Sequence, residues 1–394
     1  MKTLLLLTIF SLISFYKGYS AQLSQGAKIS LLTCAAGDEI YSYFGHSAIR
    51  INDPESGIDY VFNYGAFSYD SPNFIWRFVK GETYYMLAGQ RMASFMESYH
   101  EEQRSVYEQV LNISQSEKQS LFDALIENAK KENCVYLYRH FSDNCSTRVR
   151  DQFEKCANHS LQYDTLSDSK LSYRDLVDQY VPTNSWNGFG IKLALGIGAD
   201  KITTYSQKMF LPDYLMNSMA SAKIVRDGVE AAFVSPRTTL FEAKPIATGF
   251  SMTSPAIVVN AFFLFVALFT FIEYRRKKRF IWLDFIVFFS VGFAGLLLSF
   301  LCFYSILEAT GWNLNLIWAV PTHFIFAFVW LIPSLRPRLE WYLKFTAGIV
   351  LLFLISLLLL PQTFHWLVVP LCLTLLLRTL LSLKLNMFQF RSKG

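Results

Sequence analysis

The chain has 394 residues, of which 52% are hydrophobic and 17% are charged. This charged fraction lies well below the roughly 25% of an average soluble domain, which excludes a disordered chain and a highly charged nucleic-acid-binding protein. Aromatic residues make up 16% and point toward a lipid environment. The net charge of +5 is uneven, because residues 255–394 contain 12 Lys+Arg and 4 Asp+Glu whereas residues 21–254 contain 22 and 27. We therefore expect an acidic region followed by a basic region of different character.

The N-terminus predicts a secretory signal peptide over residues 1–20, cleaved after Ser20. Lys2 precedes an apolar run from Leu4 to Phe15, and small residues follow at Gly18 and Ser20. A retained membrane anchor is the alternative, but the run of about 12 residues is shorter than the roughly 20 that a spanning helix needs.

The rest of the chain divides near residue 254. Residues 21–254 are mixed in composition, with strand-like and helical stretches, and predict an exported α+β domain. From residue 255 onward we expect an all-α transmembrane domain with five helices, each long enough to cross a bilayer. The five apolar segments are 255–274, 282–305, 315–332, 343–360 and 364–383.

The loops between these segments predict the topology. Lys and Arg gather at 275–279, 336–338 and 384–393, after the first, third and fifth segments. The loops around 308–313 and 361–363 contain neither residue type. By the positive-inside rule, the basic loops and the C-terminus are cytosolic and residue 254 lies outside.

A β-hairpin is expected over residues 43–65, with a turn at 52–57. If Ile51 pairs with Ile58, His46 lies opposite Asn63 on the same face. A slip of one residue would place Tyr64 opposite His46 instead. Asn63 is therefore the candidate third catalytic residue, which would orient His46, with Tyr64 and Asp59 as the alternatives.

A second segment, Phe141 to Phe153, predicts a helix that begins near Cys145. Asp143 or Asn144 can cap this helix, and a helix N-terminus favours the thiolate form of a cysteine. Cys145 is thus a candidate nucleophile, with His46 as the base that accepts its proton.

Other interpretations of these residues remain open. Cys145 could be inert or disulfide-bonded, and His46 could be structural. Cys34 is a rival nucleophile and His140 a rival base. Among the four cysteines of the exported region, Cys134 and Cys156 could form a pair, although the sequence alone allows three pairings. No zinc-binding spacing is present, and no metal or cofactor is expected.

The order of a histidine on an early hairpin and an Asn-Cys at a helix start resembles the circularly permuted papain-like group, which includes lecithin:retinol acyltransferase and permuted NlpC/P60 proteins. More closely, the chain resembles the Bacteroides-type lipoprotein N-acyltransferase family over nearly its whole length. The motifs that carry this resemblance are Leu31–Cys34, Gly45–Arg50, Asn63–Gly65, Asp143–Arg148 and Phe210–Leu215.

The resemblance implies a permuted papain-like periplasmic catalytic domain at 21–254 and a multi-pass protein of the bacterial inner membrane. It implies an acyltransferase that moves a fatty acyl chain from a membrane phospholipid, through a Cys145 thioester, to the α-amine of diacylglyceryl-cysteine lipoproteins. The expected partners are the donor phospholipid, diacylated lipoproteins and the lipid bilayer, and no nucleic acid. A phospholipase or thioesterase, an NlpC/P60-type cell-wall peptidase and a membrane-anchored sensor are the alternatives.

Substrate-binding residues are harder to select from the sequence. Arg148, Arg50 and Tyr64 are candidates, since an arginine can bind a phospholipid phosphate bidentately. An ion pair of Arg148 or Arg150 with Asp151 or Asp143, which would stabilise the helix, is at least as good an interpretation. Four ionisable residues of the membrane region, whose roles the sequence leaves open, are Asp284, Glu308, His323 and His365.

Overall fold

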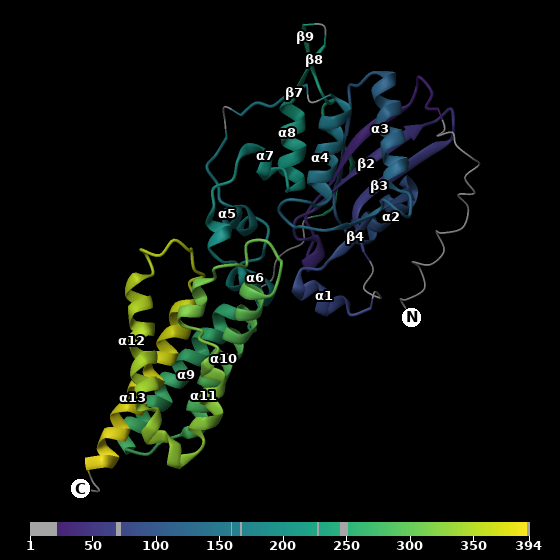
Figure 1. The fold of residues 1–394 in the computed structure, drawn as a ribbon. Helices are drawn as coiled ribbons and strands as arrows, with labels where there is room; N and C mark the ends of the chain where they lie inside the picture. Colours follow the sequence, from purple (N-terminus) through teal and green to yellow (C-terminus); the bar gives the residue numbers. More distant parts are fainter. Residues whose placement is uncertain are drawn as a thin grey trace.

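The computed structural model describes residues 22–391, except 68–71, 159, 166–167, 227 and 245–250. The chain forms an N-terminal α+β domain followed by a helical C-terminal domain (Figure 1). The predicted signal peptide, residues 1–20, lies outside the described residues.

The N-terminal domain is built on a seven-stranded antiparallel sheet with the order β10-β5-β1-β2-β3-β4-β6. Its strands are β1 (Lys28–Cys34), β2 (His46–Asp53), β3 (Ile58–Ala66), β4 (Tyr84–Arg91), β5 (Val106–Val110), β6 (Val135–Leu137) and β10 (Thr238–Phe241). A smaller sheet contains β7 (Leu161–Gln162), β8 (Lys223–Arg226) and β9 (Val229–Ala232).

Both faces of the large sheet are covered by helices, because apolar residues occur at consecutive positions of its central strands. Leu31 of β1 packs toward α3 (Gln115–Asn128), α4 (Cys145–Cys156) and α8 (Pro212–Ser221). Leu32 packs toward α2 (Met92–Glu101) on the opposite face. Successive side chains of a strand point to opposite faces, so this central strand is apolar on both sides.

Shorter helices connect these layers. They are η1 (Ile40–Ser42), α1 (Phe74–Lys80), α5 (Tyr173–Asp178), α6 (Trp186–Ala194), η2 (Ile197–Asp200) and α7 (Tyr205–Lys208). Helices α1 and α6 lie at the end of the domain that adjoins the helical domain (Figure 1).

The register of the β2–β3 hairpin differs from the expected register by two residues. Ile51 pairs with Tyr60, and Asp53 rather than Ile51 pairs with Ile58. The turn is shorter than predicted because the buried carboxylate of Asp53 accepts hydrogen bonds from Ser24 and Ser56. A displacement of two residues keeps every side chain on its expected face.

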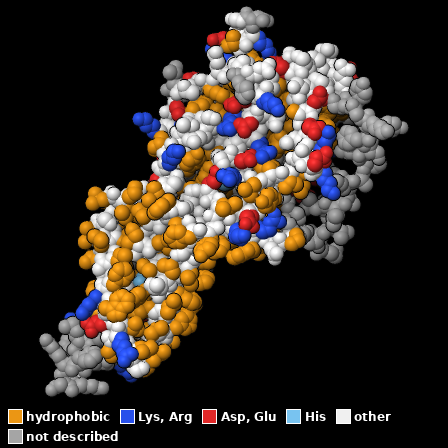
Figure 2. Space-filling view, in the orientation of Figure 1, with side chains coloured by type: hydrophobic (Ala, Val, Ile, Leu, Met, Phe, Trp, Pro, Cys, Tyr) orange, Lys and Arg blue, Asp and Glu red, His pale blue; other side chains and the backbone are white. Residues whose placement is uncertain are grey.

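The C-terminal domain consists of apolar helices whose outer surface is hydrophobic (Figure 2). Its elements are α9 (Pro255–Arg276), α10 (Ile281–Phe303), η3 (Leu314–Ile317), α11 (Thr322–Trp330), η4 (Pro333–Leu339), α12 (Glu340–Ser356) and α13 (Val368–Arg391). In the described part of the chain, three helices are long and apolar enough to cross a membrane, namely Pro255–Arg276, Ile281–Phe303 and Pro333–Ser356.

The third expected apolar segment, 315–332, is not one continuous helix. It divides into η3 and α11 on either side of Pro321, which has no backbone N–H to continue a helix. Helix α11 has 9 residues. At 1.5 Å per residue it is about 14 Å long, roughly half the hydrocarbon thickness of a bilayer.

Candidate active site

Cys145 is the first residue of α4, and Asn144 caps this helix. The Asn144 Oδ1 accepts from the N–H of Thr147 at 2.9 Å, and the Thr147 hydroxyl accepts from the N–H of Asn144 at 2.8 Å. The Asn144 Nδ2 donates to the carbonyl oxygens of His140 and Phe210, each at 2.8 Å. Of the two capping residues that the sequence allowed, the structure selects Asn144. This side chain fixes both the helix start and the loop that leads to it.

The thiol of Cys145 is buried, and its pKa is influenced by the nearby ring of His46. Burial by itself raises the pKa of a thiol, but the charge and hydrogen bond of His46 outweigh it, and the pKa of Cys145 falls below its usual value of 9.0. The N–H of Ser47 and the hydroxyl of Ser146 lower the pKa of Cys145 further. The N-terminus of a helix also lowers the pKa of a thiol placed there. Cys145 is thus set to form a thiolate.

His46 is the first residue of β2, and its ring is oriented by Asn63 of β3. The His46 Nε2 lies 3.1 Å from the Asn63 Oδ1. The Asn63 Nδ2 donates to the carbonyl of Val61, which leaves its Oδ1 to face the ring. Because an amide oxygen only accepts, Nε2 carries the proton and Nδ1 is the basic nitrogen. The ring is therefore in the tautomer that a base for Cys145 requires.

The backbone before His46 depends on Gly45. This glycine has φ +78°, and a Cβ at its position would lie 2.6 Å from the carbonyl oxygen of Cys34. Only glycine lets the chain approach β1 this closely and turn into β2. The turn sets the position of His46 at the end of the strand.

Three residues were proposed to orient His46, and in the structure Asn63 is the one hydrogen-bonded to its ring. The Tyr64 hydroxyl donates to the Asn128 Oδ1 at 3.1 Å, and burial raises the pKa of Tyr64 to about 12. Asp59 is paired with Arg50. Tyr64 faces α3 and α4, whereas Asp59 belongs to an ion pair elsewhere on the sheet.

Arg50 lies on the face of the sheet opposite α4. Ile49 packs toward α4 and Ala48 toward α2, so the alternation of β2 places Arg50 with Ala48. Its guanidinium is paired with Asp59 at 2.8 Å and with Glu108 at 3.1 Å. The guanidinium of Arg50 is thus engaged by two carboxylates of the sheet.

Arg148 lies one turn after Cys145 on α4. Its guanidinium makes two hydrogen bonds to the carboxylate of Asp143, at 2.6 and 2.8 Å, and lies 3.5 Å above the centre of the Tyr136 ring. The expected ion pair with Asp143 is present, and a quarter of the Arg148 side chain stays exposed. This pair connects the loop before Cys145 with the helix after it.

The rival nucleophile is buried, and the rival base is half-buried with its Nε2 shielded from solvent. Burial raises the pKa of Cys34 to about 12, which keeps this thiol protonated at neutral pH. Burial lowers the pKa of His140 to about 4, so this imidazole is neutral. The His140 ring packs against Phe44 and Phe210, at centroid distances of 4.4 and 5.7 Å. All six cysteines are free, Cys134 and Cys156 included.

Two serines beside the candidate residues were not selected from the sequence. The hydroxyls of Ser47 and Ser146 lie 2.9 Å apart in the buried contact between β2 and α4. Ser47 directly follows His46, and Ser146 directly follows Cys145. A serine next to each candidate residue is the sequence feature that could have identified this pair. The contact fixes the helix start against the strand that carries the histidine.

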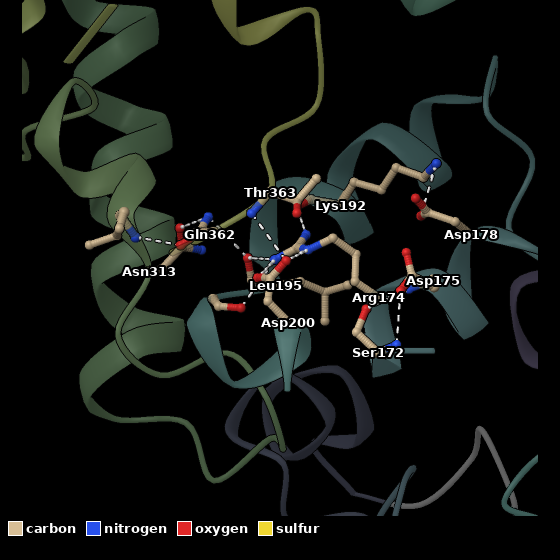
Figure 3. A network of polar contacts seen from close by, with 12 residues as sticks. Ser172, Arg174, Asp175, Asp178, Lys192, Leu195, Asp200, Asn313, Gln362 and Thr363 are labelled. Atoms are coloured by element: carbon tan, nitrogen blue, oxygen red, sulfur yellow. Dashed lines mark hydrogen bonds and ion pairs between the residues drawn. The ribbon is translucent and has the colours of Figure 1, made fainter. Parts of the chain in front are cut away.

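Polar residues also join the two domains, at the end where the helical domain adjoins the N-terminal domain (Figure 3). Asp200 accepts from Arg174 at 2.9 Å within the N-terminal domain and from the N–H of Thr363 at 3.1 Å in the loop after α12. The amides of Asn313 and Gln362 donate to backbone carbonyls at the end of α6. These hydrogen bonds attach the N-terminal domain to two loops of the helical domain.

The remaining segments singled out in the sequence have structural surroundings. Phe210–Leu215 leads into α8 within the core and is buried at Phe210, Leu211 and Leu215. In the helical domain, Asp284 pairs with Arg378 at 2.8 Å, and His323 Nδ1 lies 2.7 Å from the Tyr342 hydroxyl. The His365 ring packs against Phe189, with centroids 5.1 Å apart. Glu308 accepts hydrogen bonds from the loop before Cys145.

Comparison with protein families adds a finding for each domain. The family described as the Lnb N-terminal periplasmic domain matches residues 19–180, and the Lnb transmembrane domain matches residues 247–389. No curated protein and no solved structure matches the chain. The two matched regions follow the order of the α+β and helical domains described above. The chain belongs to the Lnb-type family, in which a periplasmic domain is joined to a transmembrane domain.

Proposed function

We propose that this protein transfers a fatty acyl chain from a membrane phospholipid to the α-amine of the diacylglyceryl-cysteine of lipoproteins. The observation that carries the proposal is the contact between the start of α4 and the start of β2, where the hydroxyls of Ser146 and Ser47 lie 2.9 Å apart. Each serine adjoins a candidate residue, Cys145 or His46, and His46 lowers the pKa of the Cys145 thiol. The family suggests the coarser conclusion, a membrane enzyme of lipoprotein processing with its N-terminal domain in the periplasm.

In the first half-reaction, the Cys145 thiolate attacks the carbonyl carbon of a phospholipid ester. The C–O bond to glycerol breaks, a thioester forms, and the imidazolium of His46 protonates the departing alkoxide of the lysophospholipid. Asn63 keeps the ring in place during this transfer. The first N–H groups of α4 have no intrahelical acceptor and are our candidates to stabilise the tetrahedral oxyanion.

In the second half-reaction, the neutral α-amine attacks the thioester. The C–S bond breaks, an amide forms, and the proton released by the amine passes to His46 while Cys145 returns to the thiolate. A thioester is a good acyl donor to an amine, so the covalent intermediate separates a difficult transfer into two steps. No metal or cofactor takes part in this scheme.

Arg148 is the residue we retain for contact with the phospholipid phosphate. It lies one turn from Cys145 and is partly exposed, although its charge is shared with Asp143. Arg50 is paired on the opposite face, and the Tyr64 hydroxyl is engaged by Asn128. We assign these two residues to the support of the sheet rather than to substrate.

We further propose that the N-terminal domain, 21–254 after removal of residues 1–20, has a permuted papain-like fold. We also propose that all five apolar segments of 255–394 cross the inner membrane, the third of them as η3 and α11 together. The loops that carry Asn313 and Thr363 contact the N-terminal domain. Lys and Arg side chains lie at the far end of the helical domain (Figure 2), and the last turn of α9 contains Arg275 and Arg276. This arrangement supports a cytosolic C-terminus.

The test uses the full-length enzyme in phospholipid nanodiscs with a diacylglyceryl-cysteine peptide as acceptor. Mass spectrometry should find the N-acylated peptide with wild-type protein and none with Cys145→Ala. Full activity of Cys145→Ala would overturn the nucleophile assignment. Release of free fatty acid at the same rate with and without the peptide would instead identify a phospholipase or thioesterase that uses the same thiol.

A further inference from the structure

Helix α1 carries an apolar patch on the N-terminal domain. Its sequence is FIWRFVK, yet none of its residues is buried. Ile75, Trp76 and Phe78 are 78%, 57% and 43% exposed. A single exposed apolar residue is ordinary, but three within four positions form a patch that is unfavourable in water.

This patch lies at the level of the outer end of α10. The N–H of Ile306, just after α10, donates to the carbonyl of Lys80 at 2.8 Å. The rings of Trp76 and Phe300 lie 5.3 Å apart, and Phe300 is in the last turn of α10. Helix α10 is long and apolar enough to cross a membrane, so its last turn marks where the headgroup region begins. Hydrophobic side chains continue from the helical domain onto the adjoining base of the N-terminal domain (Figure 2).

A row of aromatic rings leads from α1 toward the sheet. We call this set the aromatic row, and it consists of Phe78, Phe74, Phe67, Tyr85 and Tyr138. Successive ring centroids lie 6.1, 5.8, 4.9 and 4.5 Å apart. Each ring is therefore within the range of direct aromatic contact with the next.

The aromatic row ends beside the candidate nucleophile. Gly65, with φ +87°, lies between the last ring and Cys145. A Cβ at Gly65 would be 3.5 Å from Tyr138 and 3.9 Å from the Cβ of Cys145. The row thus extends from an apolar helix at the membrane surface to the immediate surroundings of the thiol.

We propose that α1 and the aromatic row bind the acyl chain of the donor phospholipid, with α1 lying in the outer interface of the bilayer. The inference rests on the proposed acyl transfer at Cys145. The occupant follows from continuity with α10, because the same surface passes from a membrane-crossing helix to α1. Arg77 places positive charge at the headgroup level, where a phosphate would lie, whereas Lys80 is paired with Glu82 at 2.6 Å.

The first test measures contact and not catalysis. Full-length Cys145→Ala protein in phosphatidylethanolamine nanodiscs is irradiated with a phosphatidylethanolamine that carries a diazirine on its acyl chain. We expect labelled peptides that contain α1 and Phe67. Labels confined to the helices of the C-terminal domain would overturn the inference. If wild-type protein forms no thioester while α1 is labelled, the proposed function fails and the lipid-binding surface stands.

The second test compares two exposed apolar residues. Ile75→Glu places a charge in the patch, and Val229→Glu places one on β9, at the opposite end of the domain, where Val229 is 68% exposed. We expect Ile75→Glu to raise the KM for phospholipid by about tenfold or more with kcat little changed, and Val229→Glu to leave both unchanged. Equal KM values for the two variants would contradict a bilayer-bound α1.

Discussion

Glu308 of the helical domain holds Ser142, three residues before the candidate nucleophile. Its carboxylate accepts from the backbone N–H groups of Phe141 and Ser142, at 2.7 and 3.2 Å, and from the Ser142 hydroxyl. Glu308 lies in the loop between α10 and η3, at the end of the helical domain that adjoins the periplasmic domain. A loop of the membrane domain thereby fixes the segment that enters α4.

We expect Glu308→Gln to lower kcat for acyl transfer by about tenfold, because hydrogen bonds to a charged acceptor are worth about 1.5–3 kcal/mol and the loop before Cys145 would loosen. The KM for phospholipid should change little, since Glu308 acts on Cys145 through the loop. Steady-state kinetics of the full-length protein in nanodiscs separates the two constants.

Glu340→Gln is the matched control for Glu308→Gln. Glu340 is also in the helical domain, but it pairs with Lys344 on α12, away from the interface. This variant should retain wild-type kinetics. Identical kcat values for the two variants would show that the contact with Ser142 does not position the nucleophile.

His46 is expected to control the ionisation of Cys145. In the wild type its charge and hydrogen bond outweigh burial and lower the pKa of the thiol below 9.0. In His46→Gln the burial remains and the charge is gone, so the pKa of Cys145 should rise. The measurement is the pH dependence of iodoacetamide labelling, followed by mass spectrometry of the peptide that contains Cys145. Labelling follows the thiolate, so the midpoint should move to higher pH in the variant.

The control for this titration is His100→Gln. His100 is an exposed residue of α2 whose ring packs on Phe241, and its replacement should leave the labelling midpoint of Cys145 unchanged. A midpoint that is the same in wild type and His46→Gln would mean that another group lowers the pKa of the thiol.

Local patterns made part of this arrangement predictable. The helix start at Cys145 follows from Asn144 and Thr147, which lie within four residues of each other, and the domain order follows from composition. The hairpin register was wrong by two residues because Asp53 is held by Ser24, 29 positions away. The sequence also could not reveal what Glu308 does, since its contact with Ser142 spans 166 positions. Contacts of this range depend on the packing of whole domains and leave no local pattern.

Asn63 should affect the kcat of acyl transfer and not the stability of the folded protein. Asn63→Ala removes the acceptor at 3.1 Å that fixes the His46 ring, so we expect kcat to fall by about tenfold or more. Asn128→Ala is the matched control, because it removes an amide that bonds Tyr64 in the same domain. Comparable losses of kcat in both variants would indicate a general structural effect and remove Asn63 from its orienting role.

Asn144 should contribute to both stability and activity, whereas another helix cap of the same domain should contribute to stability alone. Asn144→Ala removes the cap of α4 and the hydrogen bonds to the carbonyls of His140 and Phe210, which would remain buried. The cap alone is worth about 1 kcal/mol and each unsatisfied carbonyl adds a similar cost, so the thermal midpoint should fall measurably.

Ser114→Ala removes the equivalent capping box at the exposed start of α3 and should cost about 1 kcal/mol with kcat unchanged. Thermal unfolding and acyl-transfer assays on both variants give the comparison. If Asn144→Ala retained wild-type kcat at a temperature where it is fully folded, the cap would not be what positions Cys145, and its role would be limited to holding α4.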